Sequence, residues 1–373
     1  MRLPWTLGVV LMSITLSTAS TSTLENTADL TSPIMSSAVT EAQIKERLAT
    51  INLPLEVEDT DEVVRRINQY VLAGRHETEA ILGRTIAFFP VFEHYLELHG
   101  LPKEMKYLPM IESGLRPTVK SHVGAAGMWQ LMGITARHHG LQVNDQVDER
   151  FDPYKSTEAA VRMLKYLDGM FDDWALVLSA YNAGPGRIQN AVRYAGSSDY
   201  AKVYPHLPRE TKRYVPAFVA AAYIANFYHL HQLTPSATSS FSQDLRILTV
   251  KQTLSFAKIA EITGLSYKDI AAINPSYLRG YIPQNSKGNF LALPATASVK
   301  MRDYLTKEVK AKEQNLVPTL YVVAPGDNLE QIARMFHTTE EKIRDWNGLG
   351  DQPVVLNQEL TLLLSRAYLI NRA

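Results

Sequence analysis

The sequence predicts a mainly helical α+β protein, in which a helical domain is followed by two small modules that each combine strands and helices. Three observations predict this fold class. Apolar residues recur at helical spacing from about residue 41 to residue 228. A stretch rich in Ser, Thr and Pro interrupts this pattern at residues 233–243. Beyond it, the residues from Val250 onward match those from Val323 onward at constant spacing, which indicates an internal repeat.

The helical domain is predicted from five stretches that each carry one apolar stripe. The residues at their ends suit helix boundaries. Asp152-Pro153 suits a helix start, Gly100 and Gly184 suit helix ends, and Pro216 would start or kink the last helix. The stretches are DEVVRRINQYVLAG, ETEAILGRTIAFFPVFEHYLELHG, STEAAVRMLKYLDGMF, WALVLSAYN and YVPAFVAAAYIANFY.

The two repeat copies share one order of elements: strand, helix, helix and strand. The first copy reads RILTV, SFAKIAEI, YKDIAAIN and FLALP, and the second reads TLYVV, NLEQIARMF, EEKIRDWN and LTLLL. Polar residues stand where the helix N-caps are needed, namely Ser255, Ser266, Asn328 and Thr339. We therefore expect two small β-α-α-β modules.

The first 19 residues are predicted to be a secretory signal peptide. Arg2 precedes an uncharged apolar stretch that ends in small residues, with Ser17 and Ala19 placed as at a cleavage site. The apolar stretch is shorter than a membrane span requires, and a retained single anchor is the alternative. We expect export to the periplasm or cell envelope, with membrane association only if this segment is retained.

The rest of the chain divides where its composition changes. The predicted ranges are a Ser/Thr-rich tether at 20–40, the helical domain at 41–231, a linker at 232–244, the first module at 245–296, a charged connector that can be helical at 297–317, and the second module at 318–366.

The composition excludes several classes of protein. With 46% hydrophobic and 20% charged residues, the 373-residue chain is neither disordered nor polytopic. Lys plus Arg and Asp plus Glu are balanced at 38 each, so no field attracts nucleic acid. Cysteine is absent, which excludes disulfides, thiolate metal sites and a lipid-modified cysteine. The pairs His138-His139 and His229/His231 lack companion ligands at metal spacing, so we expect no metal site. We also expect no cofactor and a monomeric protein.

One carboxylate, Glu112, stands out because it ends an apolar segment. If LPKEMKYLPMIES is helical, Met105, Leu108 and Glu112 share the stripe that faces the interior. Burial and the negative end of a helix that Gly114 closes would both raise the pKa of Glu112. Such an acid can donate a proton near neutral pH. The alternative is a partly solvated surface residue or ion-pair partner.

Three further segments could line a cleft beside that acid. In GAAGMWQLM (Gly124–Met132), small residues allow close approach of a ligand, Met128 and Trp129 offer apolar contact, and the Gln130 amide can recognise hydroxyl or acetamido groups. A Gly-rich turn buried against the core is the alternative. In AYNAGPGRI, the side chains of Tyr181 and Asn182 close an apolar helix, and ETKRYV places Tyr214 near the start of another, where ordinary packing is the alternative.

Taken in this order, four segments over roughly residues 85–230 resemble the soluble lytic transglycosylase family, the lysozyme-like enzymes that cut peptidoglycan. They are Glu112-Ser113, Gly127–Met132, Ala180–Gly184 and Glu210–Val215. The two repeats resemble LysM modules, which bind glycans that contain N-acetylglucosamine. The resemblance implies a lysozyme-like helical catalytic domain that acts on peptidoglycan glycan strands.

The resemblance also implies residue roles. Glu112 would act as acid and then as base, while the 6-hydroxyl of the sugar closes to a 1,6-anhydro product. Ser113, Gly127, Met128, Gln130 and Met132 would line the saccharide site, Tyr181 and Asn182 would hold the acetamido region and the acid, and Tyr214 would be a weaker member of the same pocket. In the second module, the glycan would be bound by Gly326, Asp327 and Asn328.

Two departures and three alternatives stay open. The first repeat lacks the Gly-Asp pair of the second, which puts its glycan binding in doubt, and the lipid-attachment cysteine of some relatives is missing. A lysozyme-type hydrolase is one alternative to a transglycosylase, and a non-catalytic peptidoglycan binder is another. The repeats could also be small packing modules without a ligand.

Overall fold

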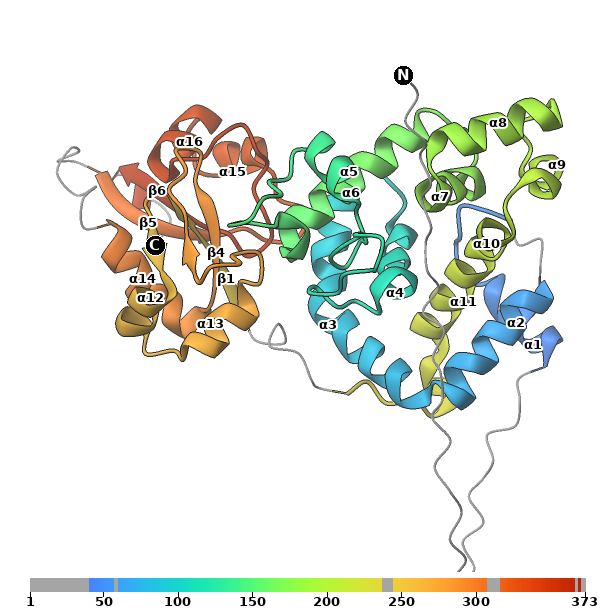
Figure 1. The fold of residues 1–373 in the computed structure, drawn as a ribbon. Coiled ribbons are helices and arrows are strands. Elements are labelled where there is room, and N and C mark those ends of the chain that lie inside the picture. Colours follow the sequence, from blue (N-terminus) through green and yellow to red (C-terminus); the bar gives the residue numbers. More distant parts are fainter. Residues whose placement is uncertain (1–39, 57–59, 237–243, 307–315, 366–367, 370–373) are drawn as a thin grey trace, which may run out of the picture. The chain divides into compact units, whose positions relative to one another are not determined.

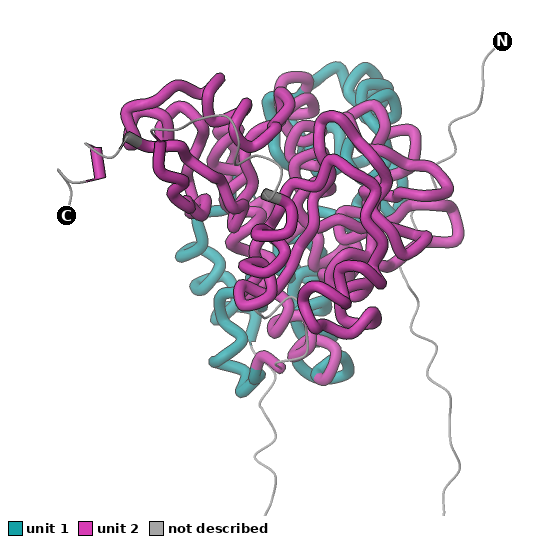
Figure 2. The backbone as a smooth tube through the Cα atoms, turned by 90° about the vertical axis from the view of Figure 1, so that its left-hand side faces the viewer, with its two compact units in different colours: residues 1–75, 171–234 teal, residues 76–170, 235–373 magenta. Residues whose placement is uncertain are grey.

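A computed structural model describes residues 40–56, 60–236, 244–306, 316–365 and 368–369. The predicted signal peptide and all of the predicted tether except Thr40 lie outside the described residues. The chain forms two compact units, and each is built from two separate stretches (Figure 2). Unit 1 holds residues 1–75 and 171–234, and unit 2 holds residues 76–170 and 235–373. The helical domain expected at 41–231 therefore contributes residues to both units.

The secondary-structure elements in the described residues of unit 1 are all helical. Its central helix α11 (Tyr214–Phe227) is buried along both sides and packs against α2 and α7. Pro216 is accommodated in the first turn of α11, where a missing N–H costs no helical bond. The other elements are α1 (Glu41–Leu48), α2 (Thr60–Asn68), the π-helical turn η1 (Gln69–Ala73), α7 (Trp174–Ala183), α8 (Pro185–Ala195), α9 (Tyr200–Val203), η4 (Tyr204–His206), α10 (Arg209–Lys212) and η5 (Tyr228–His231).

The helical half of unit 2 is organised by the long helix α3 (Arg75–Leu98), which contains Pro90. Phe92 of this helix meets the ring of Trp129 edge to face, with the ring centroids 5.1 Å apart. The remaining elements of this half are η2 (Lys103–Tyr107), α4 (Leu108–Ser113), α5 (Gly133–His138), η3 (Glu149–Phe151) and α6 (Pro153–Asp168). The predicted start of α6 is confirmed, because Asp152 accepts hydrogen bonds from the backbone N–H groups of Tyr154 and Lys155.

The single helix expected over residues 101–113 is wrong in its first part. Residues Lys103–Tyr107 form a 3₁₀ turn, and α4 begins afterwards at Leu108. Pro109 explains the break, because it has no N–H to donate to Met105 and so cannot extend an α-helix from the preceding turn. Proline is favoured in the first turn, and α4 starts there instead.

Each repeat forms the predicted module, with two long antiparallel strands and two helices between them (Figure 1). In the first module β1 pairs with β4 from Leu245↔Pro294 to Val250↔Asn289, and in the second β5 pairs with β6 from Leu316↔Ser365 to Val322↔Glu359. All four predicted N-caps are confirmed by side-chain bonds to the first turns. The elements are β1 (Leu245–Val250), β2 (Leu254–Ser255), α12 (Phe256–Thr263), α13 (Tyr267–Ile273), β3 (Tyr281–Ile282), β4 (Asn289–Pro294), β5 (Leu316–Val322), α15 (Leu329–Met335), α16 (Glu340–Asn347) and β6 (Glu359–Ser365).

The segment expected as a charged connector belongs in large part to the first module. Residues 297–306 belong to helix α14 (Ala295–Thr306), which packs against α12 and β1, whereas residues 316 and 317 begin β5 of the second module. Ala297 and Met301 are buried in the core of the module, so the apolar side of this helix closes that core. Within the described part of the chain, no helix is both long and apolar enough to cross a membrane.

Candidate active site

Glu112 lies in the last turn of α4, as the sequence predicts. Gly114 closes the helix in the left-handed conformation, with φ of 61°. The side chain of Glu112 is half-buried, between the interior position that was expected and a fully solvated one. It therefore has neighbours in the protein and a face toward solvent, as an acid that meets a substrate requires.

Two guanidinium groups cover the carboxyl end of α4. The Nε of Arg116 donates to the carbonyl of Ser113 at 3.0 Å, and Arg84 donates to the carbonyl of Gly114 at 2.7 Å. Cations at this end offset the negative end of the helix dipole. Neither arginine stands in the helix itself, so the sequence does not reveal this compensation.

Ser113 joins α4 to the Gly-rich loop. Its side chain is 4% exposed, and its hydroxyl donates to the carbonyl of Met128 at 2.8 Å. The backbone N–H of Arg116 donates to the same hydroxyl at 3.3 Å. The Ser113 hydroxyl is therefore bonded within the protein, and a contact of Ser113 with the saccharide stays a prediction.

The loop Gly124–Met132 packs its largest side chains into the core. Met128 and Trp129 are fully buried, and the indole N–H of Trp129 donates to the Thr157 hydroxyl at 2.9 Å. The expectation that these two side chains offer apolar contact to a ligand is corrected accordingly. Gly127 is also buried, with φ of +80°, and a Cβ added there would lie 1.8 Å from the carbonyl oxygen of Arg150.

Gln130 and Met132 are the half-buried members of this loop. Gln130 has a positive φ of 47°, and its amide nitrogen donates to the carbonyls of Gly127 at 2.8 Å and Val119 at 3.3 Å. The side-chain oxygen of Gln130 accepts no hydrogen bond from the described residues. The backbone thus fixes the direction of this amide and leaves its oxygen for a donor such as a hydroxyl or an acetamido N–H.

The ion pair of Asp148 and Arg150 anchors the loop, a role that was not predicted from the sequence. The carboxylate of Asp148 accepts two bonds from the guanidinium of Arg150, at 2.9 and 2.7 Å. The same guanidinium donates to the carbonyls of Gly124 at 2.8 Å and Leu131 at 3.1 Å, near the two ends of the loop. Spacing could not reveal this arrangement, because the loop and Arg150 meet only in the folded chain.

The other predicted site residues lie in unit 1. Asn182 is 4% exposed at the end of α7, and its side-chain oxygen accepts a bond from the Thr211 hydroxyl at 3.1 Å. This bond brings together two of the four sequence segments, AYNAG and ETKRYV. Tyr181 is half-buried, and Tyr214 is 8% exposed at the start of α11. The structure therefore groups the predicted residues into one set in unit 2 and one set in unit 1.

The predicted glycan-binding residues of the second module shape the loop before α15. The N–H of Gly326 donates to the Nδ1 of His94 at 3.3 Å, and Asp327 accepts bonds from the Ala324 N–H at 2.8 Å and the Tyr321 hydroxyl at 2.5 Å. Asn328 forms a capping box with Gln331. In the first module the residue equivalent to Asp327 is Leu254, which is buried in the core, so this loop cannot be reproduced there.

Family models match most of the folded chain. Residues 91–204 match the transglycosylase SLT domain. We refer to residues 91–204 below as the SLT domain, after the family model that they match. Residues 244–310 match the LysM-like domain of lytic transglycosylase MltD, and residues 321–362 match the LysM domain. The resemblance drawn from the four segments and the repeat is confirmed by these matches.

The chain is also similar to curated lytic transglycosylases. It is 30% identical over 276 residues to membrane-bound lytic murein transglycosylase D of Escherichia coli strain K12, which covers 70% of this chain and 60% of that protein. It is 29% identical over 143 residues to the soluble lytic murein transglycosylase of the same strain, covering 36% of this chain and 22% of that protein. The chain thus spans only part of the length of these relatives.

Solved structures of lytic transglycosylases resemble parts of the chain at low identity. An inactive mutant of lytic transglycosylase Slt from Pseudomonas aeruginosa gives a TM-score of 0.36 at 18% identity, and the match covers 52% of this chain and 33% of that one.

The described residues contain no group of three or more His, Cys, Asp or Glu side chains that could hold a metal ion.

Proposed function

We propose that this protein is a peptidoglycan lytic transglycosylase. It would cleave the β-1,4 bond between N-acetylmuramic acid and N-acetylglucosamine and leave 1,6-anhydro ends. The observation that carries the proposal is the placement of Glu112 within an SLT domain, at the closed end of α4, which the Ser113 hydroxyl joins to the loop that bears Gln130. The printed names of the curated relatives agree with this activity.

A single carboxylate performs the proton transfers in this proposal. Glycosidic cleavage requires a proton for the departing oxygen, and most glycosidases use a second carboxylate at the anomeric carbon. The nearby acids that follow the loop are engaged elsewhere: Asp148 is paired with Arg150, Glu149 is paired with Lys155 at 2.5 Å, and Asp152 caps α6. We assign the proton transfers to Glu112, which is half-buried in the last turn of α4 and directly precedes Ser113, the residue bonded to the loop.

The reaction then proceeds without a water molecule. Glu112 donates its proton to the glycosidic oxygen as the bond to the anomeric carbon breaks. The ionised Glu112 then accepts the proton of the 6-hydroxyl, and that oxygen closes on the anomeric carbon to form the 1,6-anhydro ring. Gln130 would accept a hydrogen bond from a sugar hydroxyl or acetamido N–H, and Tyr181, Asn182 and Tyr214 would be further substrate-binding residues.

The experiment compares digests of purified peptidoglycan by the full chain and by Glu112→Gln, with the products identified by mass. The wild type is expected to release anhydro products, and the variant to lose about 10²–10⁴-fold in rate because it removes the proton donor. Glu104→Gln is the matched control, since Glu104 lies in the 3₁₀ turn before α4 and is also half-buried.

Each alternative has its own outcome in this experiment. Products that carry an added water would show a lysozyme-type hydrolase. Absence of any cleavage by the wild type, with binding to peptidoglycan retained, would show a glycan-binding protein without catalysis. Equal rates for wild type and Glu112→Gln would remove Glu112 from the mechanism.

The second module supplies glycan retention in this proposal, because it matches the LysM domain and carries Gly326-Asp327. A tethered weak binder raises the local concentration of the next glycan strand at the active site. The protein would work as a monomer exported to the periplasm or cell envelope, where peptidoglycan lies. Membrane association would follow only from retention of the N-terminal segment.

A further inference from the structure

The first LysM-like module contacts the SLT domain through a backbone edge. The turn before η3 is closed by bonds from Asn144 N–H to the Val147 carbonyl at 2.8 Å and from Glu149 N–H to the Gln142 carbonyl at 2.9 Å. Its outer side pairs with the module. The N–H of Asp148 donates to the Ser276 carbonyl and the N–H of Leu278 donates to the Gln146 carbonyl, both at 2.9 Å.

Side chains strengthen this edge on both sides. Val147 is 1% exposed and forms part of the hydrophobic core of the module, together with Tyr277, Phe256 and Ile282. The Tyr277 hydroxyl donates to the Phe290 carbonyl at 2.5 Å, which fixes the ring against Val147. An SLT residue thus completes the core of the module, and it would be exposed if the two separated.

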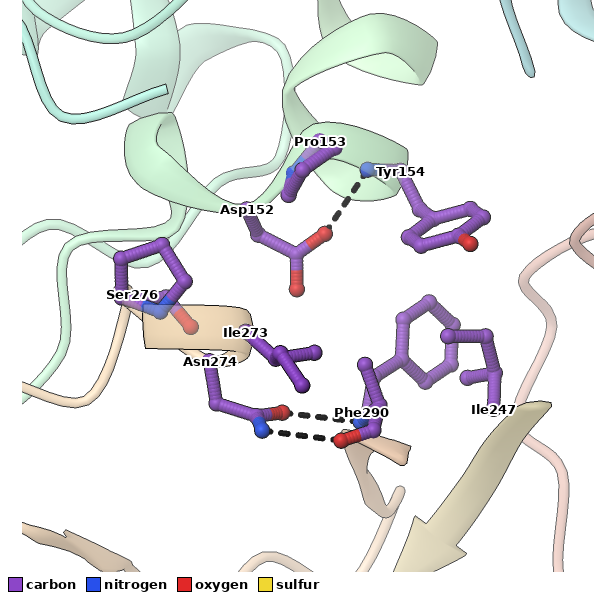
Figure 3. A pocket seen from close by; sticks show the side chains of 10 residues that line it. Asp152, Pro153, Tyr154, Ile247, Ile273, Asn274, Ser276 and Phe290 are labelled. Atoms are coloured by element: carbon purple, nitrogen blue, oxygen red, sulfur yellow. Dashed lines mark hydrogen bonds between the residues drawn. The ribbon is translucent and has the colours of Figure 1, made fainter. Parts of the chain in front are cut away.

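A second contact lies beside the edge. The ammonium of Lys155 is 4.8 Å from the ring centre of Phe290, a cation–π distance. Figure 3 shows the small pocket next to this contact, where Asp152 and Tyr154 face Ile273, Asn274 and Phe290 of the module. The pocket is lined on both sides by buried groups, so the module is packed against the start of α6.

The same turn also contacts the loop Gly124–Met132, which we call the active-site loop, through Asp148 and Arg150. The backbone N–H of Asp148 donates to the Ser276 carbonyl of the module, and the carboxylate of Asp148 forms an ion pair with Arg150. The guanidinium of Arg150 donates to the carbonyls of Gly124 and Leu131, near the two ends of the loop. Gly127 packs closely against the backbone carbonyl of Arg150. The carbonyl of Met128 accepts a hydrogen bond from the hydroxyl of Ser113, the neighbour of Glu112. A continuous chain of buried contacts therefore runs from the module to α4.

We propose that the first LysM-like module is an intramolecular brace, and that Arg150 is the positioning residue through which it holds the active-site loop. The module's surface fits the Gln146–Asp148 edge of the SLT domain, and this role needs no glycan. This explains why a module without the Gly-Asp pair is retained in the fold. The inference about catalysis rests on the function proposed for Glu112, whereas the inference about the loop does not.

Amide hydrogen exchange of residues 124–131 in the full chain tests the brace directly. Two substitutions act on opposite sides of the edge. Val147→Ser leaves a cavity and a hydroxyl in the module core, and Arg150→Gln removes the charged bonds to the loop. Both are expected to speed exchange of the loop amides about tenfold or more, because local opening becomes easier while the rest of the chain stays folded. Glu261→Ala, on an exposed part of α12, is the matched control and is expected to leave exchange unchanged.

Rates per folded molecule separate positioning from mere stability. With the folded fraction measured by circular dichroism, Arg150→Gln is expected to lower kcat on soluble glycan fragments about tenfold, because misplacement of the loop disturbs the site. Arg150→Lys keeps the charge and one donor, and should recover part of the loss in both exchange and kcat. If the role were only structural, kcat per folded molecule would equal that of the wild type.

The outcomes distinguish this proposal from the proposed function. Unchanged loop exchange in folded Val147→Ser would overturn the brace even if Glu112→Gln is inactive. Faster loop exchange together with an active Glu112→Gln would support the brace and overturn the role of Glu112. Should Val147→Ser fail to fold, Leu278→Pro removes one bond of the edge at a residue that is 46% exposed, and the same exchange criterion then decides.

Discussion

At the scale of single residues, Gly127 shows why the loop Gly124–Met132 requires a glycine at this position. Its φ is +80°, and an added Cβ would lie 1.8 Å from a backbone oxygen that cannot rotate away. We expect Gly127→Ala to destabilise the chain by at least about 2 kcal/mol more than Gly124→Ala, measured by denaturant unfolding. Gly124 is the matched control, since its φ is +90° and a Cβ there would meet nothing within 4 Å. Equal losses for the two variants would contradict the close contact with Arg150.

His231 gives unit 1 a sensitivity to acid. The residue is 1% exposed, and its Nε2 lies 3.1 Å from the hydroxyl of Tyr223, to which Arg47 also donates at 2.6 Å. Burial, followed by the charge of Arg47, lowers the pKa of His231 from 6.5 to about 4. The folded state therefore favours the neutral ring, and the tyrosine hydroxyl can donate to it.

The sign of the pH effect follows from this shift. The stability contributed by His231 is fully present above pH 6.5, which is the pKa of His231 in the unfolded chain. It is lost as the pH falls toward about 4, the pKa of His231 in the folded state. Between pH 7.5 and pH 4.5 we expect the wild type to lose about 2–3 kcal/mol more unfolding free energy than His231→Gln. Urea unfolding at both pH values measures the difference. His229→Gln, at an exposed neighbour, should behave as the wild type.

Individual residues were predictable where the cause is local. The helix caps bond to backbone groups within four residues, so their residue type and position predict their role. These residues are Gly114, Asp152 and the four N-caps of the modules. The surroundings of Ser113 and Met128 could not be predicted from the sequence, because their partners lie far along the chain or in the core. A polar residue beside an acid is equally compatible with a substrate contact and with a bond to a buried carbonyl.

At the scale of elements, the two modules repeat one pair of tertiary hydrogen bonds. Asn274 donates to the carbonyl of Ala292 and accepts its N–H, at 2.9 and 2.8 Å, which ties α13 to β4. Asn347 makes the same pair of bonds to Thr361, at 2.9 and 2.6 Å, and ties α16 to β6. The asparagine match seen in the sequence repeat thus marks a bond between helix and closing strand, which spacing alone could not specify.

Substitution of these asparagines should affect the two modules unequally. Asn274 is 5% exposed, so Asn274→Ala leaves the polar groups of Ala292 buried without a partner, at a cost of about 2–4 kcal/mol. Asn347 is half-buried, and water can replace part of its bonds, so Asn347→Ala should cost about half as much. Hydrogen exchange in β4 and β6 measures both local stabilities. A larger loss in β6 than in β4 would contradict the assignment.

Helices and strands were largely predictable because their apolar periodicity is written in each segment. The exceptions have local and nonlocal causes. Pro109 divided an expected helix, and its position should have signalled a new start. The packing of α14 on the first module could not be read from a segment whose charged side dominates its composition, since the buried residues Ala297 and Met301 depend on the core they meet.

At the scale of the whole molecule, the sequence predicts the order of the parts and leaves their association undetermined. Contacts such as Val147 with Tyr277 join residues more than a hundred positions apart, and neither residue has an unusual type. The same holds for His94 of α3, which is 1% exposed and contacts Gly326 and Val354 of the second module. These contacts make unit 2 more than a row of independent domains.

The two modules should therefore respond differently to truncation. Removal of residues 316–373 deletes the LysM domain, which has its own hydrophobic core, and exposes His94, a polar ring that water can solvate. Cleavage of soluble fragments should stay within about threefold of the wild type, while retention on insoluble peptidoglycan should fall about tenfold or more, because the tethered binder is lost. Sedimentation with sacculi and mass analysis of soluble digests measure the two effects separately.

Removal of residues 244–373 takes away the brace as well. The edge at Gln146–Asp148 loses its partner segment at residues 276–278, and Val147 becomes an exposed apolar residue. Cleavage of soluble fragments should then fall about tenfold further, because the active-site loop is less firmly held. Near wild-type activity of both truncated chains on soluble fragments would show that the first module is dispensable for the site. An equal loss in both chains would assign the support to the second module instead.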